Sequence, residues 1–282
     1  MNRKVALVTG TSRGIGKATA LALARSGHDI VATARTVKEG DTHPHQVRDA
    51  SGATLPGSLE ATGAEIRAAG RDALLQPMDL LDRSSMDATV NAALRAFGRI
   101  DVLVNNAIYQ GAGLMDDFLM GDLDGMERCF QGNVMAQVYL TRRVLPHMLE
   151  RGSGIVVNMT SAAGMTDPPL PLARGGWGFA HGATKAAFHR MAGLLHVEYA
   201  DRGIRAYNLE PGLVLTESTV AALGETSEIE KLGFPSAPPE VPAAVAAWIC
   251  NDPEAEALAG QNIHAQPFCA KRGLLPGWPP DA

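Results

Sequence analysis

A glycine-rich turn between an apolar run and a helical pattern constrains the fold of this chain most. Residues 4–8 predict a buried strand, and Thr9-Gly10-Thr11-Ser12-Arg13-Gly14-Ile15-Gly16 follows at once. An Ala- and Leu-rich helical pattern then runs from Lys17 to about Ser26. The start of a helix offers free N–H groups and a positive dipole, and glycines let a ligand approach the backbone closely. The pattern predicts a pyrophosphate site, and a purely structural turn is the less favoured alternative.

Strand and helix patterns alternate along the rest of the chain. Further strands are expected at residues 29–33, 73–78, 100–104, 154–159, 204–209 and 261–265. Helices are expected at residues 60–69, 84–97, 121–151 in two pieces, 181–199 and 242–250. This alternation predicts an α/β fold, a Rossmann-type doubly wound parallel sheet with helices on both faces. We expect one domain over residues 1–270, with a Pro-rich, lid-like segment at 213–242 and a loose C-terminal tail at 271–282.

The end of the second strand bears on the choice of dinucleotide. NAD-binding folds place an acidic residue there for the ribose 2′-hydroxyl, whereas arginine suits a 2′-phosphate. Here Ala34-Arg35 ends the strand, and Arg13 in the glycine-rich turn offers a second guanidinium. The sequence therefore favours NADP(H) over NAD(H), with two merely solvated arginines as the alternative. The polar loop that follows, Thr36 to Leu59, is long, and its His43 and His45 lack a third metal ligand at suitable spacing.

Composition narrows the classes of partner that this chain is expected to bind. The formal net charge is -5, and Lys and Arg form no cluster, which argues against nucleic acid and against a membrane surface. The apolar run near the N-terminus is too short for a signal peptide, and no stretch approaches the ~18 residues of a membrane-spanning helix. Cys129, Cys250 and Cys269 are far apart, which predicts reduced thiols in a cytoplasmic protein with no zinc site.

Two polar residues in otherwise regular segments need an explanation. Asp79 follows a predicted strand, where it either accepts from an adenine amino group or caps the next helix. Both interpretations stay open. Asn133 lies inside an apolar helical run, and a buried amide there must hold a backbone carbonyl or a water.

Several motifs, in this order and spacing, make the chain similar to the short-chain dehydrogenase/reductase family from Val5 to about Gln266. They are the glycine-rich turn at 9–16, Asp79, Asn105-Asn106-Ala107, Asn133, Ser161, Lys185 and Pro211-Gly212-Leu213-Val214-Leu215-Thr216. The resemblance implies a single domain with a seven-stranded parallel sheet. It also implies a nicotinamide-dependent oxidoreductase acting on an alcohol or carbonyl, and a homodimer or homotetramer formed through the helices near Asn133 and Lys185.

The resemblance also implies roles for individual residues. Gly10, Gly14, Ile15 and Gly16 would bind the pyrophosphate and ribose, and Ser12, Arg13 and Arg35 the 2′-phosphate. Asp79 and Leu80 would touch adenine, Asn106 and Ala107 would lie along the cofactor, and Pro211, Gly212, Val214 and Thr216 would fix the nicotinamide. Ser161 would hold the substrate oxygen, Lys185 the nicotinamide ribose, and Asn133 a water in a proton relay.

The chain departs from the family pattern at three places. Ile108 stands where a glycine usually follows Asn-Asn-Ala, and the loop at 162–180 is several residues longer than expected. The third departure is His181, which stands at the tyrosine position of Tyr-x-x-x-Lys in Phe179-Ala180-His181-Gly182-Ala183-Thr184-Lys185.

Histidine differs from tyrosine in how a nearby charge affects its protonation state. Its free pKa is about 6.5, and a nearby cation such as Lys185 disfavours the imidazolium. A neutral imidazole is a competent base for alcohol oxidation but a poor acid for reduction. Two alternatives remain: His181 only starts a helix, or Tyr109 stands in for the missing phenol.

Three functions fit these residues. The first is an NADP(H)-dependent oxidoreductase with His181 as general acid/base. The second is a redox-silent NADP(H)-binding protein, and the third is a lyase or isomerase that uses His181 as base. Because a pure binder needs no proton relay, the presence of Asn133, Ser161 and Lys185 favours the first. Residues expected to wall the pocket indicate a small, mainly apolar substrate: Met165, Leu170, Trp177, Leu223 and Phe234.

Overall fold

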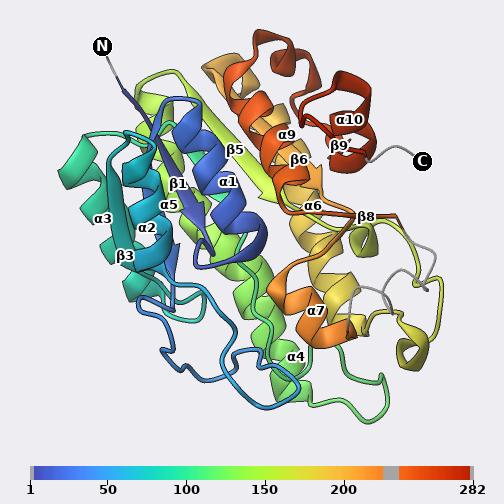
Figure 1. Cartoon of the computed structure of the whole chain (residues 1–282). Helices are drawn as coiled ribbons and strands as arrows, with labels where there is room; N and C mark the ends of the chain where they lie inside the picture. Colours follow the sequence, from blue (N-terminus) through green and yellow to red (C-terminus); the bar gives the residue numbers. More distant parts are fainter. Residues whose placement is uncertain (1–2, 225–234, 280–282) are drawn as a thin grey trace.

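A seven-stranded, all-parallel sheet forms the centre of the protein (Figure 1). The computed structural model describes residues 3–224 and 235–279. The strands are β1 (Lys4–Thr9), β2 (His28–Ala34), β3 (Ala73–Pro77), β4 (Val102–Asn105), β5 (Gly154–Met159), β6 (Ile204–Glu210) and β9 (Asn262–His264). Their order is β3-β2-β1-β4-β5-β6-β9. This confirms the predicted Rossmann-type sheet.

Helices cover both faces of the sheet, as Figure 1 shows. One face packs against α1 (Gly14–Arg25), α2 (Leu59–Ala68), α9 (Glu240–Asn251) and α10 (Ala265–Arg272). The other face packs against α3 (Arg83–Phe97), α5 (Ala136–Glu150) and α6 (Phe179–Tyr199). Strands covered on both sides are buried along their whole length, as β2 and β5 are, and their polar residues His28, Asp29, Thr33 and Asn158 are buried with them.

The strand order fixes where a ligand can bind. The chain leaves β1 towards β2 and β3 on one side and continues to β4 on the other side of β1. In open α/β sheets this reversal leaves a crevice beyond the carboxyl ends of the two central strands. The carboxyl ends of β1 and β4 carry the glycine-rich turn and Asn105-Asn106, so the predicted motifs converge at this crevice.

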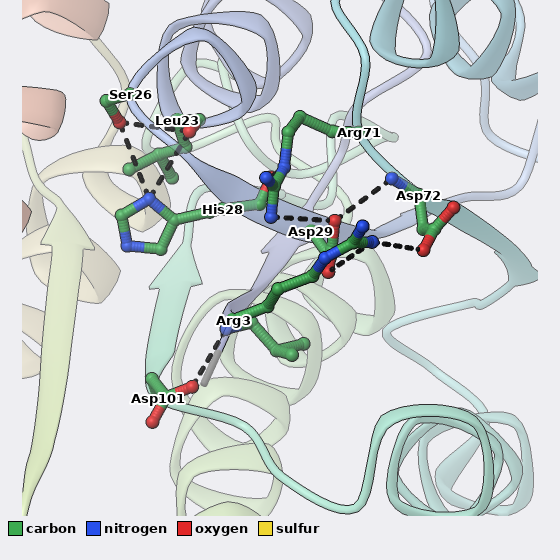
Figure 2. A network of polar contacts seen from close by, with 9 residues as sticks. Arg3, Leu23, Ser26, His28, Asp29, Arg71, Asp72 and Asp101 are labelled. Atoms are coloured by element: carbon green, nitrogen blue, oxygen red, sulfur yellow. Dashed lines mark hydrogen bonds and ion pairs between the residues drawn. The ribbon is translucent and has the colours of Figure 1, made fainter. Parts of the chain in front are cut away.

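The opposite end of the sheet is held by a polar network (Figure 2). The buried Asp29 carboxylate lies 3.0 Å from Arg71 Nη2 and 3.7 Å from Arg3 Nη1, and it accepts the Asp72 N–H at 3.0 Å. Asp101 accepts the Val5 N–H at 2.8 Å. These contacts fasten the strand starts far from the crevice.

The segments outside the sheet confirm one expectation and correct another. The helical stretch expected at 121–151 in two pieces is α4 (Leu123–Phe130) and α5, joined by a five-residue π-helical turn (Gln131–Met135). Up to residue 279 the tail is not loose, because α10 extends to Arg272 and because Leu274, Leu275 and Trp278 pack against the core.

The described parts of the predicted lid-like segment contain regular structure. It contains β7 (Leu213–Val214), α7 (Glu217–Leu223) and β8 (Ser236–Ala237), and β7 pairs with β8. Phe234 lies outside the described residues. Within the part of the chain that the structure covers, no helix is both long and apolar enough to span a membrane.

Candidate active site

One cavity of about 440 Å³ collects nearly all of the predicted site residues. It lies at the carboxyl ends of β1, β2, β4 and β5, next to the start of α6. The predicted residues that line it are Gly10, Ser12, Arg13, Gly14, Ile15, Gly16, Arg35, Asp79, Leu80, Asn106, Ala107, Ser161, His181, Lys185, Pro211, Gly212, Val214 and Thr216. Asn133 does not line it.

The first turn of α1 is shaped to receive an anion. No side chain caps this helix, and its first residues, Gly14, Ile15 and Gly16, line the cavity. The N–H groups of the first turn therefore face the cavity without a side-chain partner. A Cβ at Gly16 would collide with the Gly10 carbonyl oxygen, so only glycine permits this close approach.

Both arginines predicted to select the cofactor line the cavity, and both are fastened to the loop between β2 and α2. Arg13 donates to the carbonyl oxygens of residues 55–57 at 2.8 to 3.1 Å. Arg35 donates to the Pro44 carbonyl oxygen at 2.7 Å, and its Nη1 lies 3.9 Å from Asp79 Oδ2. The guanidinium groups thus hold this loop at the cavity edge.

The same loop crosses to the other side of the cavity mouth. Gln46 and Val47 line the cavity. The neighbouring His45 ring packs against Tyr109, with ring centroids 5.6 Å apart. The loop therefore bridges the two sides of the crevice, and the imidazole of His45 is used in packing.

The structure rules out one of the two interpretations of Asp79. The next helix, α3, is capped by Asp82, whose carboxylate accepts the Ser84 N–H at 2.9 Å. Asp79 instead accepts the Leu81 N–H at 2.9 Å. The helix-cap interpretation of Asp79 is wrong, and the adenine contact stays a prediction.

Buried asparagines link the strand ends beside the cavity. Asn105, Asn158 and Asn208 lie in register on β4, β5 and β6 and form a side-chain ladder with bonds of 3.1 and 3.3 Å. Thr9 Oγ1 accepts the backbone N–H groups of both Asn106 and Ala107 at 2.9 Å. These bonds fix the Asn-Asn-Ala turn against β1.

Asn133 clamps a neighbouring turn. It lies in the π-helical turn, where its Oδ1 accepts the Tyr109 N–H at 2.6 Å and its Nδ2 donates to the Tyr109 carbonyl oxygen at 3.3 Å. The expectation that a buried amide here holds a backbone carbonyl is confirmed. The water relay implied for Asn133 stays a prediction.

His181 lies in the first turn of α6 and lines the cavity. Burial, with a smaller contribution from the Lys185 ammonium, lowers the pKa of His181 to about 4. The imidazole is therefore neutral at pH 7. Its Nδ1 is buried and makes no hydrogen bond to any residue in the described segments.

Lys185 and Ser161 complete the same end of the cavity. Lys185 Nζ donates to the carbonyl oxygens of Met159 at 2.8 Å and Thr160 at 3.4 Å. Burial lowers the pKa of Lys185 to about 8, and the charge of Glu210 opposes this shift. Ser161 caps a short turn by accepting the Ala163 N–H at 3.3 Å.

Comparison with known proteins identifies the family. The short chain dehydrogenase family model matches residues 4–58 and 53–224. The chain belongs to the short-chain dehydrogenase family. It is 32% identical over 270 residues to an uncharacterized oxidoreductase of Methylorubrum extorquens, with 93% of this chain and 96% of the relative covered. It is also 32% identical over 267 residues to a 3-oxoacyl-[acyl-carrier-protein] reductase of Synechocystis, with 94% and 96% covered.

A solved structure shares the fold. A 7 alpha-hydroxysteroid dehydrogenase, complexed with NADH and 7-oxo glycochenodeoxycholic acid, superposes with a TM-score of 0.73 at 24% identity. The alignment covers 93% of this chain and 92% of that one. The names of these relatives are those of oxidoreductases, and the chain belongs to their family by sequence.

Sequence reasoning missed several residues that shape this dehydrogenase site. Thr9 anchors the Asn-Asn-Ala turn, and Gln137 donates to the Ala107 carbonyl oxygen at 2.8 Å. Gln137 follows Asn133 by one helical turn in an apolar helix, which was an available signal. Gln46 and Val47 carried no such signal, because nothing in a polar loop indicates which residues fold back over a cavity.

Proposed function

We propose that this protein is an NADP(H)-dependent oxidoreductase that acts on a secondary alcohol or carbonyl, with His181 as its general acid/base. The observation that carries the proposal is a single cavity shared by an uncapped glycine-rich helix start, two arginines and the group of Ser161, His181 and Lys185. An anion site at one end and a proton-transfer group at the other suit a dinucleotide that reaches a reactive carbon.

The residues present fit the dinucleotide. Gly10, Gly14, Ile15 and Gly16 surround the open N-terminus of α1 and would take the pyrophosphate and ribose. Asp79 and Leu80 would contact adenine, Asn106 and Ala107 would lie along the cofactor, and Lys185 would hold the nicotinamide ribose. The remaining contacts, at the nicotinamide, would come from Pro211, Gly212, Val214 and Thr216.

The preference for NADP(H) rests on Ser12, Arg13 and Arg35. Two guanidinium groups beside β2 would pair with a 2′-phosphate. The residue that ends β2 is Ala34, and no carboxylate takes its place to receive a ribose 2′-hydroxyl. The NADH complex of the structural relative supports a nicotinamide dinucleotide in general.

The charge state of His181 favours alcohol oxidation. Bound NADP⁺ supplies the hydride acceptor. The neutral imidazole of His181 takes the hydroxyl proton, and Ser161 holds the substrate oxygen. Burial keeps the imidazole neutral, so the base form is present at pH 7 while the acid form is scarce.

The substrate is proposed to be small and mainly apolar. A second cavity beside the start of α6 is lined by Met165, Leu172, Trp177 and Phe179, and also by Asp116, Asp117 and Asp167. The apolar part of this lining, which adjoins His181 in the chain through Gly182, suits a hydrocarbon substituent. Leu170, also predicted for this wall, does not line the cavity.

Two further expectations belong to the proposal. The three cysteines are free and buried, which is consistent with a cytoplasmic protein. Leu194 and Val197 expose apolar side chains on α6, as Met135 does before α5, which supports a homodimer or homotetramer formed through these helices.

One observation favours a second candidate, a redox-silent NADP(H)-binding protein. The base of a catalytic pair is generally oriented by a third group. His181 Nδ1 has no such partner in the described residues. Turnover separates the two candidates: NADP⁺ reduction with a panel of secondary alcohols supports the oxidoreductase, whereas tight NADPH binding with no turnover on any alcohol or ketone supports the silent binder.

A further inference from the structure

A buried carboxylate lies behind the candidate active site without lining it. Glu210 is the last residue of β6, and its side chain is only 10% exposed. The cavity lining includes the next residue, Pro211, but not Glu210. A buried carboxylate is costly unless it is paired or hydrogen-bonded, so its surroundings should show what it balances.

Its direct contacts account for the hydrogen bonds but supply no permanent positive charge. Glu210 Oε1 accepts the Gly212 N–H at 2.8 Å. Oε2 lies 3.1 Å from Nδ1 of His264, its register partner on β9. Because a carboxylate only accepts, this Nδ1 carries the proton. Among the described residues, no Lys or Arg nitrogen lies within 4 Å of Glu210.

Lys185 is a buried positive charge that lacks a nearby counter-charge within the described residues. Its ammonium is buried and bonded to two carbonyl oxygens at the end of β5, and no carboxylate of the described segments lies within 4 Å. These carbonyls adjoin Glu210, since Met159 pairs with Leu209 and the Thr160 N–H donates to the Leu209 carbonyl oxygen at 2.9 Å. A buried ammonium without counter-charge loses its proton readily.

Glu210 and Lys185 are on the same side of the sheet. Asn208 on β6 donates to the His189 carbonyl oxygen of α6 at 2.7 Å, so its side chain points towards that helix. Strand side chains alternate, and Glu210, two residues later, points the same way. The negative charge of Glu210 raises the pKa of Lys185 against the effect of burial.

The other titratable groups in this region offer no alternative counter-charge. His181 and His189 lie one turn before and after Lys185 on α6, and His264 faces from β9. All three are either neutral or positive. Glu210 is the one carboxylate whose charge acts on Lys185 within the described residues.

We propose that Glu210 is a positioning residue for the reaction proposed above, on which this inference rests. Its carboxylate is the counter-charge that keeps the Lys185 ammonium protonated, and it acts from behind the cavity through the ends of β5 and β6. The competing explanation is that Glu210 only holds the Gly212 turn.

The test is a direct titration of Lys185 by NMR with [ε-¹³C]lysine, which needs no turnover. The sequence holds six lysines, and Lys185→Arg assigns the resonance. In wild type we expect a midpoint near pH 8. Glu210→Gln keeps an acceptor for the Gly212 N–H but removes the charge, and should lower the midpoint by about one unit, a tenfold change in the proton equilibrium.

Two variants make the result decisive. Glu198→Gln, on the exposed side of α6, should leave the Lys185 midpoint unchanged. Glu210→Asp withdraws the charge by one methylene. It should lower the Lys185 midpoint by less than Glu210→Gln does. This variant decides the question if Glu210→Gln does not fold. A midpoint equal to wild type in both Glu210 variants overturns the proposal. Because the titration is independent of catalysis, it can succeed even if the protein proves redox-silent.

Discussion

The Lys185 ammonium donates to the Met159 carbonyl oxygen at 2.8 Å, one helical turn after His181 on α6. This bond draws the positive charge towards the end of β5. The neighbouring imidazole is buried beside that charge, and both effects keep it neutral. The proton chemistry at this site therefore begins from an unprotonated base.

The first prediction concerns the pH dependence of alcohol oxidation. The pKa of His181 is lowered to about 4, so the rate should be flat from about pH 5 to about pH 7 and fall tenfold per unit below pH 4. The pKa of Lys185 is lowered to about 8, so the rate should fall again as the ammonium is lost above that pH. Initial rates of NADP⁺ reduction from about pH 3 to about pH 10 measure both limbs.

The rate of carbonyl reduction should change with pH in the opposite direction on the acid side. It requires the imidazolium, whose population at pH 7 is roughly 0.1% for a pKa of about 4. NADPH oxidation should therefore rise as pH falls from 8 to 5. A reduction rate that is independent of pH over this range would show that His181 is not the acid.

The second prediction concerns the glycine-rich turn. Gly16→Ala places a Cβ against the Gly10 carbonyl oxygen and should destabilise the fold by about 1–3 kcal/mol and abolish dinucleotide binding. Gly193→Ala is the matched control, because it lies in α6 with no atom within 4 Å of the new Cβ. The control should bind normally and gain up to about 1 kcal/mol. Thermal melts with and without NADPH measure both effects.

The third prediction separates the two arginines. Arg35→Gln should weaken NADPH binding about 10- to 100-fold and leave NADH binding nearly unchanged, because a charged hydrogen bond contributes about 1.5–3 kcal/mol. Arg13→Gln should weaken both, because it also releases residues 55–57 from the cavity edge. Titrations of nucleotide fluorescence give the four affinities. Equal affinity of wild type for NADPH and NADH would refute the 2′-phosphate assignment.

The fourth prediction concerns Tyr109 as a stand-in for the missing phenol. Tyr109 lines the cavity, but its hydroxyl is buried beside Gly111 and His45 and interacts with the Arg128 guanidinium. Tyr109→Phe should therefore keep kcat within about twofold of wild type. A loss of 10²-fold or more, the magnitude expected of a general acid/base, would assign the chemistry to Tyr109.

Strands and helices were predictable where one physical rule dominates. The run at 154–159, apolar apart from Asn158, is β5 residue for residue, because a parallel strand covered on both faces favours apolar residues. The start of the strand predicted at 100–104 was less predictable, because Ile100 is fully buried and yet the strand begins only at Val102. Burial alone therefore does not define a strand boundary.

What depends on distant contacts was not predictable. Arg13 was expected to face a phosphate, and its bonds to residues 55–57 depend on the path of a loop without periodicity. Leu274 and Trp278 pack on the core although the Pro- and Gly-rich tail suggested no structure. The charge relation between Glu210 and Lys185 arises from strand register, which single residues do not reveal.

The central claim is that the neutral imidazole of His181 moves the proton, and steady-state kinetics of NADP⁺ reduction on an alcohol panel test it most directly. Wild type, His181→Tyr and His181→Phe should be compared after equal NADPH affinity has been verified. The account predicts turnover in wild type, a kcat lower by about 10²- to 10⁴-fold in His181→Phe, and restored carbonyl reduction at pH 7 in His181→Tyr. A His181→Phe variant as active as wild type, or a wild type that binds NADPH but turns nothing over while His181→Tyr does, would contradict it.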